Sequence, residues 1–130
     1  MPNALTPIAD VATQLRNYFL NRPFGAIRFW RFAVVRPHDQ SFELVSTRID
    51  GDRLDLSFVH ASHQGTAGVL SIWSPQGLEI SAKGVIVRRA ARLRLDDSEA
   101  WLDGDSYRIR TPRGEGSFAI SGTEALALEI

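Results

Sequence analysis

Residues 42–60, FELVSTRIDGDRLDLSFVH, decide the fold class of this chain. The inward face of the second half carries Leu54, Leu56, Phe58 and His60. This period of two is that of a pleated strand with one buried face. Asp50-Gly51 interrupts the pattern at its centre, and this dipeptide is a strong signal for a tight hairpin turn. The stretch therefore predicts two antiparallel strands, Phe42–Ile49 and Arg53–His60.

The same period continues toward the C-terminus in shorter segments. Ser74-Pro75-Gln76-Gly77 has the composition of a turn and predicts a second hairpin between Val69–Trp73 and Leu78–Lys83. We expect Val85–Leu95 to form one long strand, with a helix over Arg88–Leu102 as the competing interpretation. Further short strands are predicted over Ala100–Leu102, Asp105–Arg110, Ser117–Ile120 and Ala125–Ile130.

Upstream of residue 42 the pattern predicts one strand and one helix. Ala26–Val35 alternates with apolar residues on both faces, so the strand needs cover on both sides. Before it, apolar residues fall three and four positions apart, which predicts an amphipathic helix over about residues 7–20. Thr6 is the expected N-cap, and Pro7 the first helical residue. We expect the helix to pack against the strand that follows it.

These elements predict a mainly β fold in a single domain of residues 1–130, with a helix at about 7–20 and a β-rich part over 26–130. The short connections favour an antiparallel meander of about nine strands, closed or nearly closed as a barrel. In outline this resembles the small calycin or lipocalin-like barrels. The Gly-x-Trp sequence of lipocalins is replaced here by Gly25-Ala26-Ile27, so the likeness concerns the fold alone. A β-sandwich is the alternative.

Composition excludes several functional classes. The 130 residues contain no cysteine, which excludes disulfide frameworks, thiolate zinc sites and thiol proteases. No apolar run is long enough to cross a bilayer, and no signal-like segment opens the chain, so we expect a soluble cytoplasmic protein with no membrane partner. Fifteen basic and fifteen acidic residues cancel, which leaves little self-repulsion between copies. A homodimer or another homo-oligomer is therefore compatible with the sequence.

No catalytic or metal-binding motif is present. There is no G-x-S-x-G elbow, and the adjacent Asp96 and Asp97 point to opposite faces of a strand. His60 and His63 have a spacing that a metal site can use, but no third ligand follows at a recognised spacing. We therefore predict no catalytic residues, no metal and no cofactor, and an enzyme is not the expected class.

Arg88, Arg92 and Arg94 form the most distinctive local pattern, because a continuous strand would place all three on one face. Three guanidinium groups in a row can bind phosphates. They can equally pair with Glu79, Asp97 or Glu99 on neighbouring strands, and this is the interpretation that we favour. With a net charge of zero, nucleic acid is not an expected partner.

The leading functional expectation is non-enzymatic binding of a small apolar or amphipathic ligand in the barrel interior. The predicted ligand-binding residues are Trp30, Arg31, Phe58, His60, Trp73 and Tyr107. The alternative is a protein-interaction or self-associating module that uses the sheet edge or the N-terminal helix.

Overall fold

The structure, a computed structural model, describes residues 7–20, 22–29, 33–35, 42–60, 63–95, 97–119 and 125–130. Within these ranges the chain forms one helix, α1 (Ile8–Phe19), and twelve strands. The strands are β1 (Ala26–Phe29), β2 (Ala33–Val35), β3 (Phe42–Asp50), β4 (Arg53–His60), β5 (His63–Trp73), β6 (Gln76–Ser81), β7 (Gly84–Arg89), β8 (Arg92–Leu95), β9 (Ser98–Asp103), β10 (Ser106–Thr111), β11 (Gly114–Ala119) and β12 (Leu126–Glu129). The predicted mainly β class with an N-terminal helix is confirmed, although there are more strands than the nine expected.

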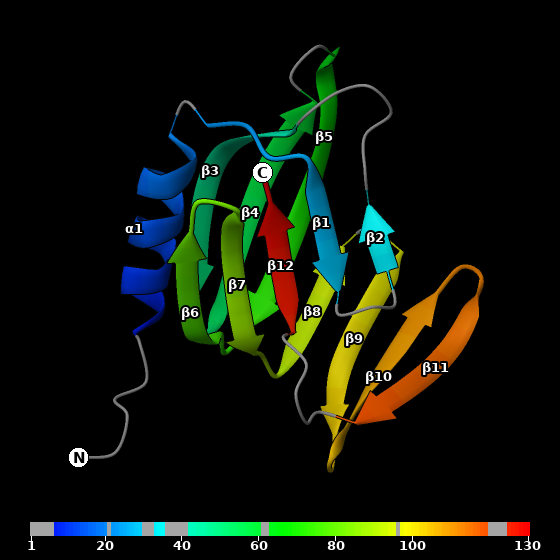
Figure 1. Cartoon of the computed structure of the whole chain (residues 1–130). Coiled ribbons are helices and arrows are strands. Elements are labelled where there is room, and N and C mark those ends of the chain that lie inside the picture. The colour runs from blue at the N-terminus through cyan, green and yellow to red at the C-terminus, as the bar shows by residue number, and fades with distance from the viewer. Residues whose placement is uncertain are drawn as a thin grey trace.

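The strands form two antiparallel sheets (Figure 1). One has five strands in the order β2-β1-β12-β7-β6, and the other has seven in the order β11-β10-β9-β8-β5-β4-β3. Buried apolar side chains of both sheets join one core, for example Leu54 and Ile72 from the larger sheet and Ile27 and Leu126 from the smaller. Over the described strands each sheet keeps two edges, so the calycin or lipocalin-like barrel is not confirmed. The two layers fit the sandwich alternative.

The hairpin predicted from residues 42–60 is confirmed, with β3 and β4 paired from Phe42↔His60 to Asp50↔Arg53. Its loop is Gly51-Asp52, one residue later than the predicted Asp50-Gly51, and Gly51 has a φ of +64°. Gly104 has the same φ in the loop between β9 and β10. When only the first of the two loop residues has a positive φ, the turn is of type II′. This turn type matches the twist of the flanking strands.

The hairpin predicted across Ser74–Gly77 is wrong, because the chain changes sheets there. β5 ends at Trp73 in the seven-stranded sheet, and β6 begins at Gln76 in the five-stranded sheet. Ser74 has a φ of +52° and its backbone N–H donates to the Asp52 carbonyl at 2.8 Å. Pro75 has no N–H for a ladder, so these two residues turn the chain out of one sheet and into the other.

The single strand predicted over Val85–Leu95 is also wrong, since β7 and β8 belong to different sheets. The crossing lies at Ala90-Ala91, where the buried backbone of Ala90 lacks a strand neighbour. The Tyr107 hydroxyl replaces that neighbour: it donates to the Ala90 carbonyl at 2.8 Å and accepts from the Ala90 N–H at 3.1 Å. The phase of alternate apolar residues is unchanged across the break because the two sheets face the same core.

Ala26–Phe29 and Ala33–Val35 are two paired antiparallel strands and not the predicted single strand. β2 folds back on β1 with Phe29 opposite Ala33 and Ile27 opposite Val35. The other side of β1 pairs with β12. The C-terminal strand, which is predicted correctly, therefore lies in the centre of the five-stranded sheet, between β1 and β7.

Helix α1 begins at Ile8 with Pro7 in the cap position, one residue later than predicted, and Thr6 lies outside the described residues. Its buried face consists of Val11, Ala12, Leu15 and Phe19. This face packs mainly on β3 and in part on β4, not on the strand that follows the helix as we expected. Tyr18 also donates to the Ser81 carbonyl at 2.6 Å, so the helix spans from the edge of one sheet to β6 of the other.

Candidate functional site: a groove between the helix and an edge strand

β3 is an edge strand of the seven-stranded sheet, and a bulge interrupts it at Val45. Leu44 lies opposite Phe58 and Ser46 opposite Ser57, so Val45 is an extra residue with no partner in the β4 register. The bulge allows Leu44 and Thr47, three positions apart, to face the same side as the core residues of β4. Val45 itself is 62% exposed.

The outer edge of β3 has backbone groups without a hydrogen-bond partner in the described ranges. At its start, Phe42 exchanges two backbone hydrogen bonds with Phe24, of 3.0 and 2.8 Å. Beyond this bridge no described strand pairs with the outer side of β3. In a two-residue hairpin the closing pair, here Asp50 and Arg53, is hydrogen-bonded, and bonded and non-bonded pairs then alternate. Counting back from Asp50, the backbone N–H groups of Thr47 and Ile49 point away from β4.

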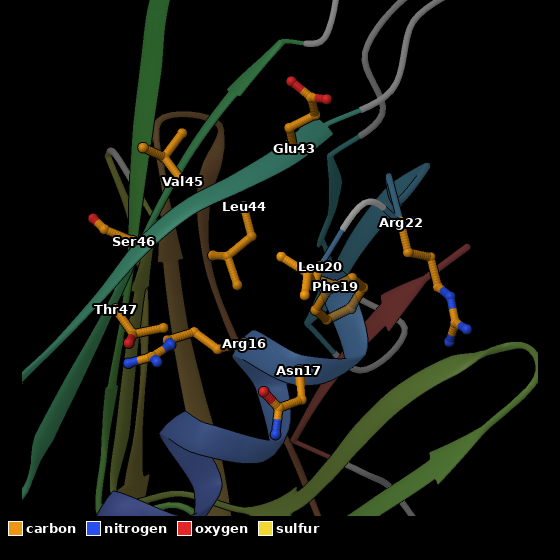
Figure 2. A pocket seen from close by; sticks show the side chains of 10 residues that line it. All are labelled: Arg16, Asn17, Phe19, Leu20, Arg22, Glu43, Leu44, Val45, Ser46 and Thr47. Carbon is orange, nitrogen blue, oxygen red and sulfur yellow. The ribbon is translucent and has the colours of Figure 1, made fainter.

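An open groove of about 550 Å³ lies between this edge and the C-terminal half of α1 (Figure 2). It is lined by Arg16, Asn17, Phe19, Leu20 and Arg22 from the helix side and by Glu43, Leu44, Val45, Ser46 and Thr47 from β3. We call it the α1–β3 groove. Leu20, 71% exposed, and Val45 supply apolar surface that water covers in the isolated chain. Its volume is within the range of ligand-binding pockets.

Aromatic rings connect the two walls of the groove. Phe19 of α1 contacts Phe24 with ring centroids 5.0 Å apart, and Phe24 contacts Phe42 at 5.3 Å. Phe42 in turn packs edge-on against Phe58 of β4, at 5.0 Å. These rings join the end of the helix to β3 and β4 through buried surface. The walls of the groove are therefore fixed by the core and not by the groove's own exposed residues.

The charged groups of the groove lack counter-charges within the described part of the chain. Arg16 and Glu43 are exposed and form neither an ion pair nor a side-chain hydrogen bond there. The guanidinium of Arg22 stacks over the Tyr18 ring, 4.3 Å from its centroid. In the view of Figure 2, Arg16 and Thr47 are drawn on one side of Leu44 and Glu43 on the other.

The outward face of the seven-stranded sheet has a different character. Arginine and tryptophan alternate across its strands in register, in the order Arg53, Trp73, Arg92, Trp101 and Arg108. The guanidinium of Arg92 lies 5.0 Å from the Trp73 ring centroid, and that of Arg53 lies 5.9 Å from it. The ring faces of Trp73 are thus already in contact with cations.

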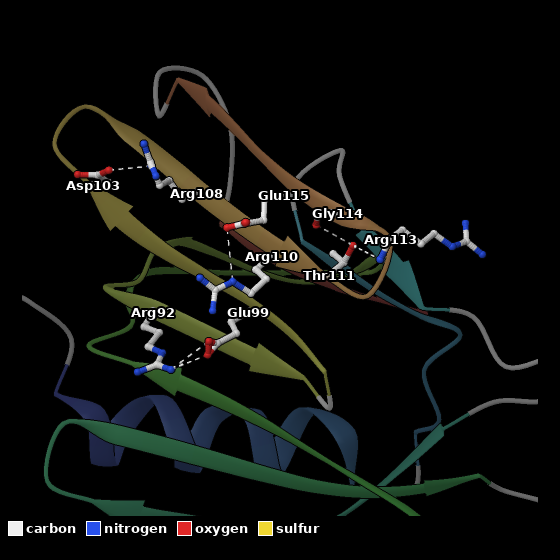
Figure 3. A network of polar contacts seen from close by, with 9 residues as sticks. All are labelled: Arg92, Glu99, Asp103, Arg108, Arg110, Thr111, Arg113, Gly114 and Glu115. Carbon is white, nitrogen blue, oxygen red and sulfur yellow. Dashed lines mark hydrogen bonds and ion pairs between the residues drawn. The ribbon is translucent and has the colours of Figure 1, made fainter.

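The same arginines pair with carboxylates of neighbouring strands or turns (Figure 3). Arg92 bonds Glu99 at 2.6 Å, Arg108 pairs with Asp103 at 2.8 Å, and Arg110 pairs with Glu115 at 3.4 Å. We call the surface formed by these six residues the ion-paired face. All six side chains keep contact with water, so each pair contributes at most about 1 kcal/mol to stability.

The arginine pattern of the sequence divides between the two sheets. Arg88 lies on β7 and Arg92 and Arg94 on β8, so the prediction of one continuous Arg88, Arg92, Arg94 face is wrong. The favoured pairing interpretation is confirmed for two of the three: Arg88 pairs with Glu79, and Arg92 with Glu99. Arg94 is exposed and forms no ion pair with a described residue.

The predicted ligand-binding residues are not gathered at one place among the described residues. Phe58 is in the aromatic cluster beneath the groove, Trp73 is on the outward face of β5, and Tyr107 is in the core against Ala90. Trp30, Arg31 and the side chain of His60 lie outside the described part of the structure. The described ranges contain no group of three metal-ligating side chains.

Among the residues that the structure describes, two ionisable groups have shifted pKa values. Burial raises the pKa of the Tyr107 phenol above its ordinary value of 10.0, while the hydrogen bond with the Ala90 backbone and the charge of Arg89 act in the opposite direction. The hydrogen bond from Arg88 lowers the pKa of Glu79. Neither group lines the α1–β3 groove.

The groove residues were missed at the sequence level, although one signal was present. Phe42 and Leu44 alternate in one phase, and Thr47 and Ile49 continue in the other. Such a phase break is the expected sign of a bulge, with Val45 as the extra residue. Nothing local indicates that α1 lies beside β3, because that contact joins segments that are separated in the sequence.

Comparison of the chain with models of protein families, with curated proteins and with solved structures finds no match in any of the three. Over the described residues, no helix combines the length and apolar character that crossing a membrane requires.

Proposed function

We propose that this chain is a protein-interaction module that binds a short extended peptide segment in the α1–β3 groove, as an added strand beside β3. The observation that carries the proposal is the outer edge of β3, which meets no described strand after Phe42 and borders an open groove. Strand addition at a sheet edge is a recurrent mode of peptide recognition, in which backbone hydrogen bonds provide affinity and side-chain pockets provide specificity.

The groove offers both components. The outward N–H groups of Thr47 and Ile49 are available to a ladder, and Leu20 and Val45 give apolar contacts at its rim. An exposed edge is also a hazard for aggregation, and the bulge at Val45 and the charges of β3 limit pairing with long flat strands. A short segment that fits between helix and strand avoids that limit.

A ligand in the protein interior, the leading expectation from sequence, has less support. Of the described residues, none with a polar or charged side chain is buried apart from Tyr107. The Tyr107 hydroxyl bonds both backbone groups of Ala90, so it is engaged by the chain itself. The interior as described offers few polar groups to orient a ligand.

The test begins with selection of binding peptides from a displayed library of random octapeptides, with the full chain as bait. Thr47→Pro removes one outward N–H and preserves the β4 ladder, because proline is tolerated at an edge-strand position whose N–H faces solvent. We expect it to weaken the selected peptides about tenfold or more, measured by titration calorimetry.

Ser117→Pro is the matched control. Ser117 is an exposed residue of β11, the opposite edge of the same sheet, and lies opposite Arg108. It should leave peptide affinity within about twofold, with both variants folded by circular dichroism. If no octapeptide is enriched, or if Thr47→Pro binds as the parent chain does, the proposed function is refuted.

A further inference from the structure

The arginines of this chain fall into two groups. At least six of the twelve described arginines pair with a carboxylate, as Arg28 does with Glu129 at 3.2 Å and Arg92 with Glu99 at 2.6 Å. Arg16 does not: it is exposed on the last turn of α1, lines the groove, and has no carboxylate partner among the described residues. The groove thus keeps a guanidinium whose five donors have no partner among the described residues.

The neighbouring charges do not neutralise Arg16. Arg22 is committed to the face of Tyr18, at 4.3 Å. Across the bulge, Glu43 and Thr47 lie opposite Val59 and Leu56 of β4, so they are about 10 Å apart along the strand. In Figure 2, the Arg16 and Thr47 side chains are drawn toward the opposite end of the groove lining from Glu43.

We infer that the segment bound in the α1–β3 groove carries an aspartate or glutamate that lies against Arg16. This inference rests on the proposed function and names the chemistry of its partner: a short extended peptide with apolar residues for Leu20 and Val45 and one carboxylate at the Thr47 end. Guanidinium and carboxylate form paired charge-assisted hydrogen bonds, and these strengthen when the segment displaces water from the groove.

A lysine at the same peptide position is disfavoured, because it brings a second cation beside Arg16 without a counter-ion. The selectivity for charge therefore comes from one described side chain. The backbone hydrogen bonds with Thr47 and Ile49 do not depend on the charge of the peptide side chain. The contributions of the backbone ladder and of Arg16 can therefore be separated by experiment.

The experiment uses the octapeptides selected on the full chain. These peptides are first sequenced, and the residue types at each position are counted. We expect enrichment of Asp or Glu at one position. Three versions of the best peptide, with Glu, Gln or Lys at that position, are then titrated against the parent chain. The Glu version should bind about tenfold more tightly than the Gln version and the Lys version should be weakest, with the advantage of Glu falling as salt is raised.

Variants of the chain then locate the effect. Arg16→Gln should abolish the preference for Glu over Gln, and Arg16→Glu should reverse it in favour of Lys. The control is Arg113→Gln, in the turn before β11, where the arginine is exposed and has no described carboxylate partner. It should leave the preference unchanged.

The outcomes separate the two proposals. Peptides that require the Thr47 N–H but show no acidic preference would overturn the carboxylate inference and leave strand addition intact. An equal loss of the preference in Arg113→Gln would assign it to net charge and overturn the role of Arg16. Binding that is insensitive to Thr47→Pro would remove the proposed function and this inference with it.

Discussion

The ion-paired face and the α1–β3 groove both expose arginines and carboxylates, but they organise them differently. On the ion-paired face, Arg92, Arg108 and Arg110 each have a carboxylate within 2.6 to 3.4 Å. In the groove, Arg16 and Glu43 have none among the described residues. A surface whose charges are internally paired offers little to a partner, whereas unpaired charges beside a free strand edge offer both charge and hydrogen bonds.

The physical origin of this difference is strand register. In a sheet, each outward residue has a fixed neighbour on the next strand, so opposite charges can be placed directly across from one another. Arg110, for example, lies opposite both Glu99 and Glu115. A helix packed beside an edge strand has no such ladder, so strand register does not pair its exposed charged residues with opposite charges.

The largest expected loss of stability comes from a substitution in the core beneath the ion-paired face. Tyr107→Phe leaves the N–H and carbonyl of Ala90 buried without the hydroxyl that bonds them. We expect the free energy of unfolding to fall by about 2–4 kcal/mol in urea titrations. The control is Tyr18→Phe, whose exposed bond to the Ser81 carbonyl can be replaced by water, with a loss below about 1 kcal/mol. Equal losses would mean that the Ala90 crossing does not depend on Tyr107.

The same residue gives a pH dependence with a definite sign. The folded-state pKa of Tyr107 is raised above 10.0, so its neutral form is favoured by folding. Its contribution to stability is present below the unfolded pKa and is lost as pH rises through the folded pKa. Urea midpoints measured at about pH 8 and about pH 11 should therefore differ less in Tyr107→Phe than in the parent chain. An unchanged difference would contradict the raised pKa.

A smaller effect tests the pairing itself. Arg92→Gln removes the bond to Glu99 and the contact with Trp73, and we expect it to cost about 1 kcal/mol of unfolding free energy. Arg16→Gln and Arg94→Gln remove arginines without described carboxylate partners, so each should change stability by less than about 0.5 kcal/mol. If Arg16→Gln were as costly as Arg92→Gln, the groove would no longer differ from the ion-paired face.

The smallest expected effect is at Glu79. Its pKa is lowered by the hydrogen bond from Arg88, so the carboxylate favours the folded state above its ordinary pKa of 4.5 and loses this advantage as pH falls through the lowered value. Arg88→Gln should raise the Glu79 pKa toward 4.5 in a carboxyl ¹³C NMR titration. A titration curve that does not move would show that the pair is absent in solution.

Local pattern predicted the elements whose partners are close in sequence. The β3–β4 hairpin, the turn at Gly104 and the apolar face of α1 follow from alternation, glycine and helical spacing within a few residues. The local sequence pattern gave wrong predictions at Ser74-Pro75 and at Ala90-Ala91, where the chain changes sheets. A strand that continues and a strand that switches to the opposite layer bury the same alternate residues, so periodicity cannot distinguish them.

The candidate site could not be predicted from the local pattern either, because it is formed by segments that are distant in the sequence. Phe58 and Trp73 were singled out as aromatics, yet the structure uses Phe58 to support the groove wall and sets Trp73 among arginines. The groove depends on the placement of α1 next to β3, and its lining residues Leu20 and Val45 are 25 positions apart in the sequence. No local pattern encodes that distance.

The sequence by itself determined that most of the chain is pleated, where the turn between β3 and β4 lies and which face of the helix is buried, because these follow from the conformations and polarity of neighbouring residues. Only the tertiary structure decided which strands became edges and which charges were left unpaired. Both are properties of layers packed around a common core, in which burial is satisfied by several strand orders but each order exposes a different edge.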